Sequence, residues 1–320
     1  MSNNIEKANK ILAIRTFLIL CFATITLFGL CITDLSGADE FRYLPVKHVM
    51  DIDGGFDRPT EVAVSKSGKI YVLDGANNRV KIFNRKGKML FSFGKSGKGA
   101  GEFYNPVGLE IDNRENIYVA DTGNQRIQIF NPGGDYVSLT DMAPMKARPV
   151  EVKLSPISGR IYVSDTHNQK VLCFKKDGSF ELSWGGYGEK LGEFKYPGMA
   201  DMDSKGNIYI VDILNGRIQV FNPDGSNPRQ LGGSGITPGT LFRPKGIVID
   251  QQSRVYVSDS YTGVIQLFDS SGKLVGILSE NKIDPLRLTT PIGMALDPEE
   301  KHLYVVQSNL NLISVFELID

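Results

Sequence analysis

Residues that build many small catalytic and metal centres are scarce in this sequence. The 320 residues include three histidines, three cysteines and one tryptophan. The histidines lie far apart without the short spacings of zinc ligands, so a histidine-bound zinc centre is not expected from His48, His167 and His302. Cys21 and Cys31 lie in an apolar N-terminal run, which leaves Cys173 alone and excludes an internal disulfide in the rest of the chain.

The sequence also lacks an excess of either charge. Lysine plus arginine and aspartate plus glutamate each number 36, and residues 39–320 carry 33 basic and 34 acidic side chains. A nucleic-acid-binding protein driven by overall charge is therefore not expected. The G-x-S-x-G motif of the α/β-hydrolases does not occur either.

Helical periodicity is absent after residue 38, and short stretches of alternating apolar residues take its place. One tyrosine recurs at intervals of 47, 44, 47, 47 and 48 residues, as Tyr71, Tyr118, Tyr162, Tyr209, Tyr256 and Tyr304. Each unit has a proline, an alternating stretch, a polar turn, an I-Y-V-type strand, a second turn and a third strand, and a fourth strand usually follows. Six units of four antiparallel strands predict an all-β fold, a six-bladed β-propeller.

The repeated unit is clearest in residues 105–131, NPVGLEIDNRENIYVADTGNQRIQIFN. Its pattern, P-x-G-[IVL]-x-[VIL]-D followed by N-I-Y-V-A-D-T-G-N-x-R-I-Q-[VI]-F, resembles the NHL repeat, and the resemblance covers residues 58–320. It indicates an NHL repeat protein of the exported bacterial type. Such propellers serve as enzymes, protein-binding modules and RNA-binding modules, so the resemblance implies the fold and leaves the function open.

The two ends of the propeller sequence are expected to meet. The last repeat ends near residues 314–316 and leaves the sixth blade without an outer strand. Residues 39–57 come before the first repeat, and residues 46–51 within them alternate as a strand does. Because an open ring would expose sheet edges, we expect residues 46–51 to complete the sixth blade and close the ring.

Residues 1–38 have the pattern of a signal peptide or membrane anchor. Lys7, Lys10 and Arg15 precede an uncharged run over residues 16–32, a hydrophobic helix is expected over 11–32, and small residues 36–38 suit a cleavage site. A cleaved signal, an uncleaved anchor and a lipoprotein attached at Cys31 are the alternatives. Each places the propeller outside the cytoplasm, as a periplasmic, secreted or membrane-anchored domain, with membrane contact only through residues 11–32 if they remain attached.

The turn after the second strand carries a recurring polar set. Asp121, Asn124 and Arg126 have counterparts in blades 1, 3 and 4, and the set decays in blades 5 and 6. Because the set recurs around the ring, we interpret it as structural, with the carboxylate binding the backbone of the turn.

A second group of polar residues falls on the first strand of each blade, on the side that faces the central channel. In blades 1 to 4 these positions hold Glu61, Glu110, Glu151, Lys153 and Asp201, whereas blades 5 and 6 have only small or apolar residues there. One hypothesis is that the carboxylates bind Ca²⁺ or a cationic ligand, with Glu61, Glu151 and Asp201 as candidate metal ligands. The alternative is that they face channel water or pair with Lys153.

The residue before the first strand's proline is arginine in alternate blades: Arg58, Arg148 and Arg243. These arginines either form a basic rim that receives an acidic ligand or neutralise the carboxylates below them. Together with the channel residues they form the candidate ligand-binding site.

The balance of charge, the export segment and the absence of a catalytic motif favour a non-catalytic scaffold at the cell envelope, which binds a protein, a peptide or another ligand. No nucleic-acid partner is expected, and Ca²⁺ is the one cofactor that the channel suggests. The enzymatic alternative is a metal-dependent hydrolase, lactonase or lyase that uses the channel carboxylates. For the non-catalytic scaffold, no catalytic residue is assigned.

Overall fold

The computed structural model describes residues 41–319. The predicted signal peptide or anchor and the predicted helix over 11–32 lie outside the described residues. Within residues 41–319, no helix is both long and apolar enough to cross a membrane.

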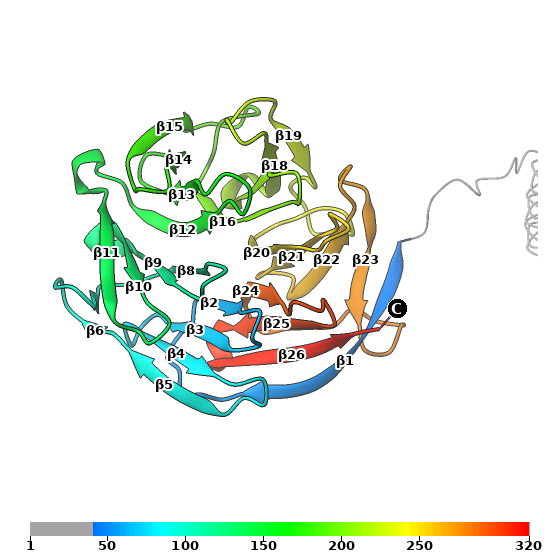
Figure 1. Ribbon diagram of the computed structural model, residues 1–320. Helices are drawn as coiled ribbons and strands as arrows, with labels where there is room; N and C mark the ends of the chain where they lie inside the picture. Colours follow the sequence, from blue (N-terminus) through cyan, green and yellow to red (C-terminus); the bar gives the residue numbers. More distant parts are fainter. Residues whose placement is uncertain (1–40, 320) are drawn as a thin grey trace, which may run out of the picture. The chain divides into compact units, whose positions relative to one another are not determined.

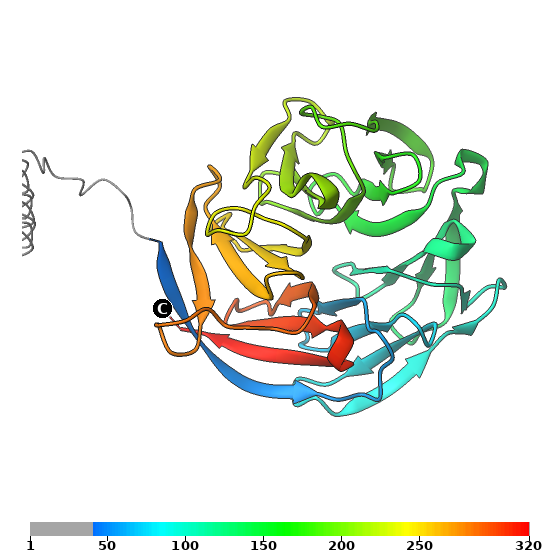
Figure 2. The same cartoon turned by 180° about the vertical axis from the view of Figure 1, so that it is seen from behind.

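The described chain folds into six four-stranded blades arranged in a ring, as Figures 1 and 2 show from opposite sides. Blade 1 contains β2 (Glu61–Val64), β3 (Ile70–Asp74), β4 (Arg79–Phe83) and β5 (Met89–Phe93). Blade 2 contains β8 (Gly108–Ile111), β9 (Ile117–Asp121), β10 (Arg126–Phe130) and β11 (Tyr136–Asp141). Blade 3 contains β12 (Pro149–Leu154), β13 (Ile161–Asp165), β14 (Lys170–Phe174) and β15 (Phe180–Gly185).

The second half of the ring repeats this order. Blade 4 contains β16 (Pro197–Met202), β17 (Ile208–Asp212), β18 (Arg217–Phe221) and β19 (Arg229–Leu231). Blade 5 contains β20 (Pro244–Ile249), β21 (Val255–Asp259), β22 (Val264–Phe268) and β23 (Leu274–Ser279). Blade 6 contains β24 (Pro291–Leu296), β25 (His302–Gln307), β26 (Leu312–Leu318) and β1 (Arg42–Ile52). The predicted six-bladed propeller is confirmed.

Short elements occupy the connections. A parallel pair, β6 (Lys95–Ser96) and β7 (Glu102–Phe103), lies between blades 1 and 2. Four 3₁₀ turns are described: η1 (Thr122–Asn124), η2 (Ala143–Met145), η3 (Ile213–Asn215) and η4 (Ser308–Leu310). The hydrophobic core lies between adjacent blades, and residues such as Tyr71, Tyr209, Phe103 and Phe194 are fully buried there.

The ring closes as predicted, with one further contact. β1 pairs antiparallel with β26, from Val46 opposite Leu318 to Ile52 opposite Ile313. β1 is longer than the expected strand, and its first residues also pair in parallel with β23, which joins blades 5 and 6 into one eight-stranded sheet. This parallel pairing requires a glycine at position 276, because an added Cβ there would lie 2.3 Å from the Arg42 carbonyl oxygen.

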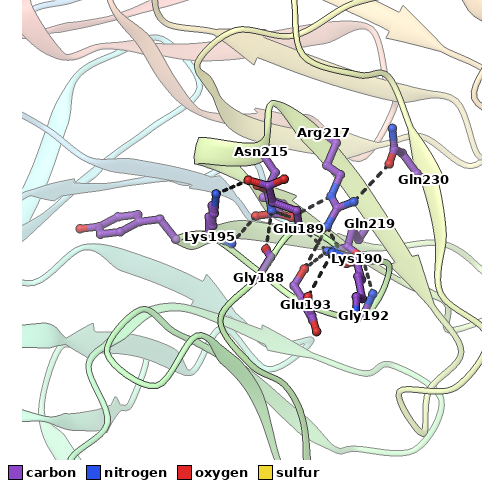
Figure 3. Close-up of polar contacts among 12 residues, drawn as sticks. Gly188, Glu189, Lys190, Gly192, Glu193, Lys195, Asn215, Arg217, Gln219 and Gln230 are labelled. Atoms are coloured by element: carbon purple, nitrogen blue, oxygen red, sulfur yellow. Dashed lines mark hydrogen bonds and ion pairs between the residues drawn. The ribbon is translucent and has the colours of Figure 1, made fainter.

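The recurring aspartate is structural, as predicted. Asp212 is fully buried, and its Oδ2 accepts hydrogen bonds of 2.8 Å from both Arg217 Nε and Asn215 Nδ2. The Arg217 Nη2 donates in turn to the carbonyls of Lys190 and Glu193, at 2.9 and 3.0 Å, and so ties down the loop between blades 3 and 4 (Figure 3). Since burial of a charged pair is favourable only when its hydrogen bonds are complete, this network explains why the set recurs.

Candidate active site

The first strands of the blades, β2, β8, β12, β16, β20 and β24, lie at the centre of the ring (Figure 1). The channel between them opens at two ends, which we call the upper and the lower mouth. The upper mouth lies where these strands begin, and its ring is Thr60, Val107, Val150, Gly198, Lys245 and Ile292. The lower mouth lies where they end, and its ring is Ala63, Glu110, Lys153, Asp201, Val248 and Ala295. Each mouth holds a cavity of about 230 to 240 Å³, and no residue among 41–319 lines both cavities.

Between the mouths the channel is too narrow for most side chains. At Gly108, Gly246 and Gly293, an added Cβ would lie within 3 Å of backbone atoms of the next blade. Blades 1, 3 and 4 instead carry Glu61, Glu151 and Met199 at this level, and the Glu61 side chain uses the space that Gly293 leaves. Because Glu61 and Glu151 replace the glycine of the repeat, two carboxyl groups lie between the mouths.

Glu61 and Glu151 are buried, with 6% and 1% of their surface exposed. Each accepts one hydrogen bond from the N–H of the next residue, at 3.1 and 3.0 Å. Burial raises the pKa of Glu61 to about 8, against the opposing effect of Lys153. Burial, reinforced by Glu61, also holds the pKa of Glu151 well above its ordinary value. Burial therefore favours the protonated form of both groups.

The lower mouth holds an ion-pair cluster. Lys153 Nζ lies 2.7 Å from Glu110 Oε2 and 3.9 Å from Asp201 Oδ1, and each of the three side chains is about one-fifth exposed. Glu110 also accepts the Ile111 N–H at 3.0 Å, and Asp201 Oδ2 accepts the Ile249 N–H of the next blade at 2.7 Å. Burial lowers the pKa of Lys153, but the three surrounding carboxyl groups outweigh burial and raise it well above its ordinary value. Burial raises the pKa of Asp201, partly offset by Lys153.

A groove between blades 2 and 3 opens from this cluster. It has a volume of about 560 Å³ and shares Glu110, Lys153 and Asp201 with the lower mouth. Its outer part is polar, with Asp112, Asn113, Arg114, Asn116, Ser155 and Lys176. The alternation of the first strands could not point to these residues, because they lie in the turns after β8, β12 and β14.

The axial donor set does not fit a resident metal ion. Within residues 41–319, no group of three or more His, Cys, Asp or Glu side chains is arranged to hold one. The Lys153 ammonium already pairs with Glu110 and lies 3.9 Å from Asp201, and burial favours the protonated form of the Glu61 and Glu151 carboxyl groups. A carboxyl group binds Ca²⁺ only after it has lost its proton. We therefore assign no chemistry in this channel to a metal.

The predicted arginine rim lies at the other end of the channel. Arg148 lines the upper mouth, whereas Arg58 and Arg243 do not line its cavity. The Arg58 N–H donates to Asn311 Oδ1 at 2.8 Å, and the Arg243 guanidinium stands over the Phe242 ring at 5.9 Å. Among the described residues no ion pair joins the three arginines to the channel carboxylates, so the structure does not bring the two predicted groups together.

Comparison with known proteins agrees with the fold. A family model described as a 6-bladed beta-propeller (DUF5128) matches residues 38–155. No curated protein matches the chain. Virginiamycin B lyase from Staphylococcus aureus is similar in structure, with a TM-score of 0.62 at 14% identity over 86% of this chain and 100% of that one. A gluconolactonase from Xanthomonas campestris has a TM-score of 0.65 at 13% identity over 87% and 97% of the two chains.

These matches correct one expectation. The prediction of a non-catalytic scaffold is wrong by this comparison, because several of the similar solved structures are named as lyases or a lactonase, which favours the enzymatic alternative. Absent motifs and balanced charge exclude particular centres, but they carry no information on a centre assembled from separate blades.

Proposed function

We propose that the chain is an enzyme that hydrolyses a lactone or ester at the lower mouth of the channel by general acid–base catalysis. The observation that carries the proposal is the Glu110–Lys153–Asp201 cluster at the inner end of the 560 Å³ groove. A partly exposed carboxylate and an ammonium group side by side supply a base and a positive charge at one point.

Asp201 is the proposed general base. Its raised pKa makes it a better proton acceptor than an ordinary aspartate, and its Oδ1 faces Lys153 rather than a backbone donor. In the proposed step Asp201 takes a proton from water, and the water oxygen bonds to the carbonyl carbon. The C–O bond to the leaving alkoxide then breaks, and the alkoxide recovers the proton from Asp201.

Lys153 is the proposed oxyanion stabiliser. Its ammonium stays charged, because the neighbouring carboxylates raise its pKa, and so it stabilises the negative charge that forms on the carbonyl oxygen. Glu110 acts on Lys153 rather than on the substrate, because its 2.7 Å ion pair fixes the position of the ammonium. Glu110 is therefore a positioning residue.

The groove indicates the class of substrate. Its outer wall offers hydrogen-bonding side chains, and the Arg114 and Lys176 side chains add positive charge at its edge. A polar groove of this size suits a hydroxylated molecule better than an apolar one. A sugar-type lactone, the class on which the named gluconolactonase acts, has this chemistry.

Hydrolysis assays on the full chain test the proposal. Glucono-δ-lactone and p-nitrophenyl acetate are the substrates, with Asp201→Asn and Lys153→Met as variants and Asp224→Asn, an exposed turn residue, as the matched control. We expect turnover to fall by about 100-fold or more in both variants and to be unchanged in the control. Turnover that survives in Asp201→Asn contradicts the proposed base. An unsaturated product in place of the hydroxy acid would assign a lyase reaction to the same base.

Two further points belong to the proposal: the type of propeller and the cellular location of the protein. We propose that the propeller is of the NHL type, on the repeated motif quoted above, and that residues 1–38 direct it outside the cytoplasm. The second point is checked by isolating the protein from the cell envelope and measuring its mass, which shows whether residues 1–38 are still attached.

A further inference from the structure

The upper mouth has a composition unlike that of the lower one. Its cavity of about 230 Å³ is lined by apolar side chains, by Thr60, Thr122 and Tyr196, and by two cations, Arg148 and Lys245. The residues among 41–319 that line it include no Asp or Glu. Positive charge on an apolar wall, without a carboxylate, is the composition of a site for an organic anion.

Both cations of the upper mouth are available to a ligand. In the described part of the chain, neither the Lys245 ammonium nor the Arg148 guanidinium has an ion pair or a hydrogen bond. Lys245 lies on β20, half-buried, with Arg243 as its charged neighbour. Burial and the repulsion from Arg243 both lower the pKa of Lys245, as expected for a cation that lacks a counter-charge.

A third polar group in this mouth lacks a partner. The Thr60 Oγ1 is buried and has no hydrogen-bond partner among the described residues. A buried hydroxyl without a partner is costly, but this oxygen has almost no accessible surface and is out of reach of a ligand in the cavity. Lys245 and Arg148 come from blades 5 and 3, so only a molecule inside the mouth could meet both.

We propose that the upper mouth is a binding site for a small organic monocarboxylate. Lys245 and Arg148 hold the carboxylate, and the apolar body of the ligand lies against Val107, Val150 and Ile292. The cavity is smaller than the roughly 300 to 1,000 Å³ of drug-sized sites, so the ligand is a small molecule rather than a peptide. An inorganic anion would leave the apolar walls uncovered. The inference does not depend on the reaction proposed at the lower mouth.

Isothermal titration of the full chain tests this site, with benzoate as the probe. Benzamide has the same body without the charge, acetate has the charge with little body, and inorganic phosphate is an anion without an apolar body. We expect benzoate to bind at least tenfold more tightly than any of the other three. Lys245→Gln and Arg148→Gln should each weaken benzoate binding by about tenfold, whereas Lys205→Gln, an exposed lysine on a lower turn, should leave it unchanged.

The alternatives give different results. Absence of benzoate binding overturns the proposal, and so does binding that survives both variants, because the ligand would then lie elsewhere. Equal affinity for benzoate and phosphate would overturn the organic class of ligand. Arg148 is exposed, so Arg148→Gln keeps the test valid if Lys245→Gln fails to fold. Because binding is measured directly, loss of the lower-mouth reaction would not affect the result.

Discussion

The two mouths of the channel are built by the same six strands and have opposite chemistry. At the lower mouth each charged group has a partner: Lys153 pairs with Glu110 and faces Asp201. At the upper mouth Arg148 and Lys245 have no such partner among the described residues, and apolar side chains surround them. The lower mouth is therefore paired but acidic overall, with one lysine against several carboxyl groups, and the upper one is positive.

This difference shows how a repeated fold can carry individual sites. The repeat itself supplies the blade, the buried aspartate of the turn and the glycine close to the axis, as at Gly108. The sites arise where single blades depart from the repeat, such as Glu61 and Glu151 in place of glycine or Lys153 among carboxylates. A symmetrical scaffold thus gains an asymmetrical channel through few substitutions.

The largest expected effect comes from removing the cation of the lower mouth. Lys153→Met leaves Glu110 and Asp201 without their counter-charge in a partly buried site, and we expect the free energy of unfolding to fall by about 3 kcal/mol. Urea denaturation at pH 7 measures it. The matched control is Lys195→Met, which breaks an ion pair with the exposed Glu189 and should cost far less, because solvent screens that pair. Equal losses in the two variants would contradict the electrostatic account of the cluster.

A second effect separates the middle of the channel from both mouths, and it depends on pH. The folded protein keeps the Glu61 proton up to about pH 8, whereas the unfolded chain loses it near 4.5. Since the folded state then binds more protons than the unfolded one, the stability that the Glu61 proton contributes is fully present below pH 4.5 and is lost as pH rises to about 8. Glu61→Gln removes this loss, so the variant should match the wild type at pH 4.5 and exceed it at pH 8.

Urea denaturation at several pH values between 4.5 and 8 measures the Glu61 effect. Glu299→Gln is the control, because Arg85 lowers the pKa of Glu299 at the surface, and this variant should gain nothing at pH 8. A Glu61→Gln variant less stable than the wild type at pH 8 would show that the carboxyl group is ionised and useful in the folded state.

The sequence predicts the fold far better than it predicts the mouths. Six tyrosines at a constant period fix the number of blades, and the missing outer strand of blade 6 fixes the role of residues 46–51, because both follow from local patterns. The parallel pairing of Arg42–Pro45 with β23 has no local signal, since it needs only an extended chain and a glycine on the opposite strand. Strand alternation does predict that Glu110 and Lys153 face the channel. Their ion pair could not be predicted, because it joins two blades and forms only when the ring has brought them together.

The smallest expected effect on stability comes from removing the buried cation of the upper mouth, and its sign should differ from that at the lower mouth. Lys245→Gln also removes a cation from the channel, but this cation has no partner to leave behind, and burial and Arg243 oppose its charge. We therefore expect the free energy of unfolding at pH 7 to stay constant or to rise by a few tenths of a kcal/mol, in contrast to the loss in Lys153→Met. Urea denaturation without added organic acid measures it, because a bound carboxylate would stabilise only the wild type. A loss of more than about 1 kcal/mol would mean that Lys245 has a structural partner, and the upper mouth would then lose its main argument as a ligand site.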